Sequence, residues 1–97
     1  MTDRLIIIAH IEAKEGQLEL VKKEVLALIE PTKKEQGCLR YELHQDHENS
    51  NLFIFTEEWE NQDLWQKHME NTHLQAFVKM TDGALENLEV YQMSRLA

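Results

Sequence analysis

The residues best suited to chemistry are histidines and aromatic side chains in the second half of the chain. Trp65 and His68 are three positions apart in a stretch with helical spacing, so they share one face of the expected helix. Trp59 precedes them, and His73 and Phe77 follow. A histidine in an apolar pocket is the expected general base near neutral pH. The cluster predicts either a substrate pocket with His68 as its base, or a core around Trp59 and Phe77 that holds a structural histidine.

The strand expected before the one that carries Trp59 adds a phenol, Tyr41, to this candidate pocket. We therefore expect Tyr41, Trp59, Trp65, His73 and Phe77 to contact substrate and His68 to be catalytic. A concave, mainly apolar space between a short split helix and a sheet is a common kind of ligand site.

The sequence gives little support to a metal or cofactor. His68 and His73 are five positions apart, about 140° around an ideal helix, and a helix break is expected between them, so they should not converge on one ion. Cys38 is the only cysteine and follows a helix end, which favours a packing role over a catalytic one. The three glycines are isolated, so no phosphate-binding loop is present. We expect no metal and no cofactor.

Hydrophobic periodicity predicts the elements that must position these residues. Apolar residues recur at helical spacing from Leu18 to Ile29, where Pro31 should interrupt the helix and Gly37 should end it. Thr72 to Gln75 matches a capping box, so the second helix should be split there. Strands are expected over residues 4–12, 38–45, 52–59 and 88–93, with Leu39, Tyr41 and Leu43 on one face of the second.

The resulting β-α-β-β-α-β order is the ferredoxin-like α+β arrangement, with helices on one face of a four-stranded sheet. The first strand is apolar at consecutive positions, Leu5 to Ala9, which predicts a strand covered on both faces. Helices can cover one face. A second copy of the chain is the simplest cover for the other, so we expect a homodimer.

The length and net charge of the chain limit the number of domains and the kinds of partner that we expect. The 97 residues suffice for one domain, 1–97, and a net charge of −8 argues against nucleic acid and anionic membrane surfaces as partners. The short apolar run near the start is too short for a signal sequence or a membrane span, and a single cysteine fits a reducing compartment. We expect a cytoplasmic protein.

Three segments resemble the antibiotic biosynthesis monooxygenase family. They are the glycine-led strand Gly37–His44, the Phe-Ile-Phe-Thr-Glu-Glu-Trp segment ending at Trp59, and the two-histidine segment His68–Phe77. The resemblance extends over nearly the whole chain. It implies a dimeric α+β barrel and a cofactor-free monooxygenase that oxidises a small quinol or polyketide-like aromatic with O2. By position, Tyr41, Trp59, His68 and His73 match the family pattern, and Trp65 departs from the smaller residue common at its position.

Other functions of the same superfamily remain open, because fold does not fix chemistry. A haem-degrading branch needs an asparagine on the first strand and a histidine ten positions after a tryptophan. This first strand has no asparagine, and the residue ten after Trp65 is Gln75. A signal-sugar isomerase would need cations for its phosphate, and Arg40 is the one central arginine. A non-catalytic ligand-binding or dimerisation module of the same fold is the main alternative.

Overall fold

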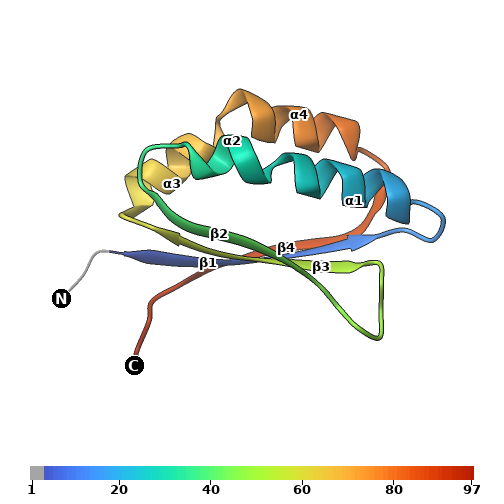
Figure 1. Ribbon diagram of the computed structural model, residues 1–97, viewed down its shortest axis with the longest axis horizontal. Helices are drawn as coiled ribbons and strands as arrows, with labels where there is room; N and C mark the ends of the chain where they lie inside the picture. Colours follow the sequence, from blue (N-terminus) through green and yellow to red (C-terminus); the bar gives the residue numbers. More distant parts are fainter. Residues whose placement is uncertain (1–3) are drawn as a thin grey trace.

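A four-stranded antiparallel sheet carries all four helices on one face (Figure 1). The computed structural model describes residues 4–97. The elements are β1 (Leu5–Ala13), α1 (Leu18–Ala27), α2 (Ile29–Lys33), β2 (Cys38–Gln45), β3 (Leu52–Trp59), α3 (Gln62–Met69), α4 (Thr72–Met80) and β4 (Leu85–Met93). The strand order is β2-β3-β1-β4, which is the ferredoxin-like topology predicted from the sequence.

The core lies between the sheet and the helices. Alternate residues of β1 point toward the helices and are buried, among them Ile7 and Ile11, while Val21 and Val25 of α1 are fully buried against them. Phe53 and Phe55 of β3 share this inner face. Burial of an aliphatic or aromatic side chain contributes about 1.5–3 kcal/mol, so this layer supplies most of the packing energy of the fold.

Among residues 4–97, no helix lies on the opposite face of the sheet (Figure 1). Ile6 and Ile8 of β1 and Ile54 of β3 lie on this face and are only partly buried. Tyr91 and Met93 of β4 pair beside them and are 42% and 45% exposed. The described chain thus leaves one side of its most apolar strand incompletely covered.

Both helical regions are divided, as expected. The first divides at Leu28, and Pro31 then falls in the first turn of α2, where its missing N–H costs nothing. The second divides between α3 and α4 at Glu70 and Asn71. The prediction that Gly37 ends the first region was wrong, because α2 ends at Lys33 with Lys34 as its C-cap. Gly37 lies in the turn before β2 with a φ of +87°, the left-handed conformation that favours glycine.

Three other local expectations were wrong. Leu39 does not share a face with Tyr41, because the register of β2 against β3 shifts between Cys38 and Arg40 and leaves Leu39 44% exposed. The capping box is absent, since Asn71 is the N-cap of α4 and no side-chain cap hydrogen bond forms there. The last strand starts at Leu85, three residues earlier than predicted.

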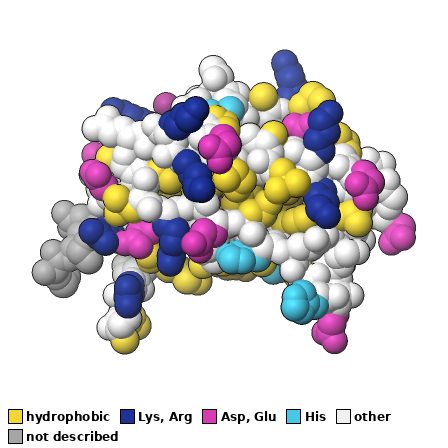
Figure 2. Space-filling model, viewed as in Figure 1, with side chains coloured by type: hydrophobic (Ala, Val, Ile, Leu, Met, Phe, Trp, Pro, Cys, Tyr) yellow, Lys and Arg dark blue, Asp and Glu magenta, His cyan; other side chains and the backbone are white. Residues whose placement is uncertain are grey.

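Figure 2 shows hydrophobic side chains gathered in a band between the helical layer and the sheet, with charged side chains around it. Within the described part of the chain, no helix is long and apolar enough to cross a membrane.

Candidate functional site

A small apolar cavity lies between the inner face of the sheet and the α3–α4 pair. Its volume is about 90 Å³, and its lining includes Tyr41, Glu57, Trp65, His68 and Phe77. An empty cavity of about 150 Å³ is known to admit benzene. A single aromatic ring would therefore need the cavity to expand.

Partly exposed aliphatic side chains from two elements, α4 and β4, line the outer side of this cavity. Val78 of α4 and Leu88 of β4 line it and are 54% and 50% exposed. Val90 of β4 also lines it and is 41% exposed. Since half-exposed side chains at a sheet edge can change rotamer at low cost, this is the side from which a ligand could enter.

His68 is the one imidazole in the cavity lining. It projects from the last turn of α3 and is 2% exposed. Its ring packs on Trp59, with centroids 4.8 Å apart, and meets the edge of Tyr41 at 5.8 Å. Its Nδ1 lies 2.8 Å from Glu35 Oε2. Because a carboxylate oxygen accepts, Nδ1 carries the proton, and Nε2 is the nitrogen left to a ligand.

Burial lowers the pKa of His68, although the hydrogen bond and the charge of Glu35 oppose the shift. The imidazole is therefore neutral at neutral pH. A neutral ring whose Nδ1–H is held by a carboxylate is ready to accept a proton at Nε2.

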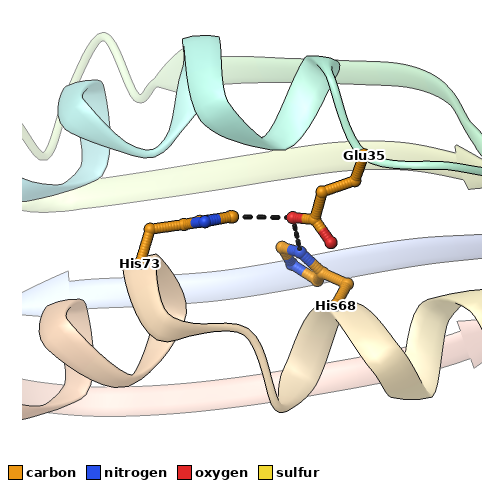
Figure 3. Close-up of side chains that lie close together, drawn as sticks. All are labelled: Glu35, His68 and His73. Carbon is orange, nitrogen blue, oxygen red and sulfur yellow. Dashed lines mark hydrogen bonds and ion pairs between the residues drawn. The ribbon is translucent and has the colours of Figure 1, made fainter.

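The Glu35 carboxylate lies within hydrogen-bond distance of two histidine rings, those of His68 and His73 (Figure 3). Its Oε2 lies 2.7 Å from His73 Nε2 as well as 2.8 Å from His68 Nδ1. The buried Thr32 hydroxyl lies 3.3 Å from the same His73 nitrogen. The expectation that His68 and His73 diverge was wrong, because the turn at Asn71 redirects the chain and brings both rings toward one carboxylate.

Of the residues that the structure describes, Glu57 is the only carboxylic acid in the cavity lining. It is 4% exposed, and its Oε1 accepts a hydrogen bond of 2.9 Å from Trp59 Nε1. Burial raises the pKa of Glu57 from 4.5 to about 7, while the Trp59 hydrogen bond lowers it and the Glu35 charge raises it. Burial beside Glu57 also raises the pKa of Tyr41, so that phenol stays protonated. The cavity thus holds a neutral base, a phenol donor and a carboxyl group that titrates near neutrality.

The structure brings four of the six predicted site residues to the cavity: Tyr41, Trp65, His68 and Phe77. Trp59 and His73 lie outside its lining. Trp59 is fully buried beneath His68, and His73 faces a surface cleft that Glu35, Lys34 and Lys67 also line.

Glu35 and Glu57 were not predicted to be site residues. Glu57 carried a usable signal, because it shares the inward parity of Phe53, Phe55 and Trp59. A charged residue on an apolar face is either paired or functional. Glu35 carried no such signal, since its role depends on a turn that brings it to residues 33 and 38 positions further along the chain.

The chain belongs to the antibiotic biosynthesis monooxygenase family, whose model matches residues 4–80. The ferredoxin-like fold is therefore shared with that family.

Individual proteins and a solved structure are also similar to this chain. The crystal structure of PA3566 from Pseudomonas aeruginosa is 36% identical over 100% of this chain and 98% of its own, with a TM-score of 0.94. The uncharacterised protein sll1783 of Synechocystis is 26% identical over 95% of this chain, which spans only 65% of that protein's length. A Bacillus subtilis protein named "Putative monooxygenase YcnE" is 27% identical over 76% of this chain and 78% of its own.

Proposed function

We propose that the chain oxidises a small electron-rich aromatic, of the quinol or polyketide-like class, with O2 and without a cofactor. The observation that carries the proposal is His68, which lines an apolar cavity while Glu35 holds its Nδ1. Family membership supports the reaction class.

The reaction begins with loss of a hydroxyl proton from the substrate to His68 Nε2. The Glu35 carboxylate, 2.8 Å from Nδ1, stabilises the imidazolium that forms. The Tyr41 phenol, kept protonated by burial, donates a hydrogen bond to the substrate oxyanion. The electron-rich anion then passes an electron directly to O2.

The overall reaction balances without another reductant. For a quinol, one oxygen atom enters the ring and the other leaves as water, and the substrate supplies all four electrons. The protein contributes deprotonation, charge stabilisation and an environment that excludes water.

Oxygen uptake with a panel of reduced quinones tests this function. We expect uptake above the autoxidation rate in buffer, and a loss of about 10²–10⁴-fold in His68→Ala, the usual contribution of a general base. His47→Ala is the matched control, because His47 is exposed in the turn between β2 and β3. Equal uptake by wild type and His68→Ala would exclude the mechanism.

The alternative is a binding module of the same fold that retains a ligand without turnover. The small volume of the cavity, about 90 Å³, favours it, because the cavity would have to expand to hold an aromatic ring and O2 together. Tight binding of a reduced quinone with no uptake above the buffer rate would select this alternative.

We also propose that two copies pair through the sheet face that has no helices. The partly buried Ile6 and Ile8 lie there. His10 lies there too, and its buried Nδ1 has no hydrogen-bond partner in the described chain. A second sheet packed on this face would cover the isoleucines and could supply an acceptor for His10.

A further inference from the structure

We propose that Glu35, His68 and His73 form a reversible binding site for a divalent transition-metal ion of the Zn²⁺ type. Their three ligand atoms lie within 4.8 Å of one another and come from three separate segments: the connection from α2 to β2, the end of α3 and the start of α4 (Figure 3). The binding proposal does not depend on the oxidation proposed above.

The donor set is one that transition ions bind. Two imidazole nitrogens and one carboxylate oxygen suit Zn²⁺, Co²⁺, Ni²⁺ and Fe²⁺, and three protein ligands leave positions for water or a small ligand. The rings are held in place before any ion arrives, because both point at the same oxygen, Glu35 Oε2. Little side-chain entropy would then be lost on binding.

The geometry needs movement of both the carboxylate and the rings. With metal–ligand bonds of about 2.0–2.2 Å, neighbouring ligands around a tetrahedral ion lie roughly 3.4 Å apart. Glu35 Oε2 now lies 2.7 and 2.8 Å from the two nitrogens, so the carboxylate must withdraw by less than an ångström. All three ligand atoms lie within 4.8 Å of one another, and the two ring nitrogens, which are the most widely separated pair, must approach each other. The ion replaces the two N–H protons at the centre, and each ring carries its proton on its other nitrogen instead.

An ion can reach the site from solvent. Glu35 and His73 line an open surface cleft on the outer side of the helices, and their side chains are 12% and 21% exposed. Lys34 and Lys67 line the same cleft and oppose a cation, whereas the net charge of −8 favours one at longer range. We therefore expect reversible binding, not a permanent structural ion.

Metal binding would have a consequence at the cavity. An ion bound to His68 Nδ1 would leave the ring's proton on Nε2, the nitrogen that the proposed oxidation uses as its base. A ring protonated at Nε2 cannot accept a substrate proton, so a bound ion would block His68 as a base. The site would act as a reversible inhibitory switch on whatever reaction uses that nitrogen.

Diffraction and calorimetry test the site. Crystals of the EDTA-treated protein soaked in ZnCl2 should show an anomalous peak between the three side chains. Titration with ZnCl2 should show one ion per chain in the wild type and in His47→Gln, the matched exposed-histidine control. His73→Gln, which alters the most exposed ligand, should weaken binding at least tenfold, and circular dichroism should show that this variant remains folded.

Several outcomes would overturn the proposal. The first is that millimolar Zn²⁺ gives neither heat in calorimetry nor an anomalous peak in the crystal. The second is an anomalous peak only elsewhere, for example between His10 and Glu89. The third is unchanged Zn²⁺ binding in folded His73→Gln. The peak in wild-type crystals decides the question even if the variant fails to fold. None of these results bears on oxygen uptake by the metal-free protein, so failure of the metal site and failure of the oxidation remain distinguishable.

Discussion

Glu35 Oε2 lies 2.8 Å from His68 Nδ1, although the two residues are 33 positions apart in the chain. Glu35 does not line the cavity, whereas His68 does. The carboxylate therefore contacts the cavity through the ring that it holds, which makes it a positioning residue, and its charge also raises the pKa of Glu57 in the cavity lining.

Glu35→Gln should separate the hydrogen bond that Glu35 accepts from His68 from the negative charge that Glu35 places beside the ring. The amide can still accept a hydrogen bond from Nδ1, but the charge that stabilises the imidazolium is gone. We expect kcat for quinol oxidation to fall about tenfold while KM changes little, because no cavity-lining atom is altered. Steady-state oxygen uptake measures both constants. A change confined to KM would contradict the positioning role.

Glu57 should make the stability of the protein depend on pH. Its pKa is raised by burial from 4.5 to about 7, so the folded chain binds a proton that the unfolded chain releases between these values. The contribution of this group is therefore favourable below about pH 4.5 and is lost as pH rises to about 7. The difference corresponds to roughly 3 kcal/mol at most.

Glu57→Gln isolates this effect, because the other carboxyl groups are unchanged. The free energy of unfolding of wild type minus that of Glu57→Gln should fall between pH 4.5 and 7 and then level off. Urea denaturation at four or more pH values measures it. A difference that is constant across the range would show that Glu57 ionises normally.

Trp59 should be needed for its indole N–H as well as for its volume. Its Nε1 donates to Glu57 Oε1 at 2.9 Å in a fully buried setting. Trp59→Phe removes the donor and leaves a buried carboxyl without this partner, which should cost about 1–3 kcal/mol beyond the lost packing. Trp65→Phe is the control, since Trp65 is similarly buried at 5% but its indole makes no such bond to another described residue. Equal losses in the two variants would show that only volume matters.

The sequence was sufficient for the fold but not for the contacts of the site. Period-2 and period-3.6 patterns predicted the strands and helices, and the split between α3 and α4 fell where the pattern indicated it. Side-chain contacts between distant segments, such as Glu35 with His73, depend on how the turn at Asn71 directs α4. That direction is a tertiary property, so a helical-wheel angle for His68 and His73 could not predict their convergence.

Gly37 should tolerate substitution far less than Gly16, although both have positive φ, at +87° and +82°. A Cβ at Gly37 would lie 2.8 Å from Leu64 Cβ and closer still to its Cδ1, whereas a Cβ at Gly16 meets nothing within 4 Å. Gly16→Ala should therefore cost only the backbone strain, about 1–2 kcal/mol. Gly37→Ala should cost more, by about 1–3 kcal/mol for overpacking against α3. Thermal and urea denaturation compare the two, and equal costs would show that Leu64 moves aside freely.

The uncovered sheet face should decide the oligomeric state. Ile8 lies on that face at the centre of the sheet, so Ile8→Lys would place two like charges in the paired interface of a dimer. We expect wild type to sediment as a dimer at micromolar concentration and Ile8→Lys as a monomer with unchanged circular dichroism. Leu26→Lys is the control, because Leu26 is 53% exposed on α1, in the helical layer. A monomeric wild type, or a dimer that Ile8→Lys leaves intact, would show that this face is not where two copies meet.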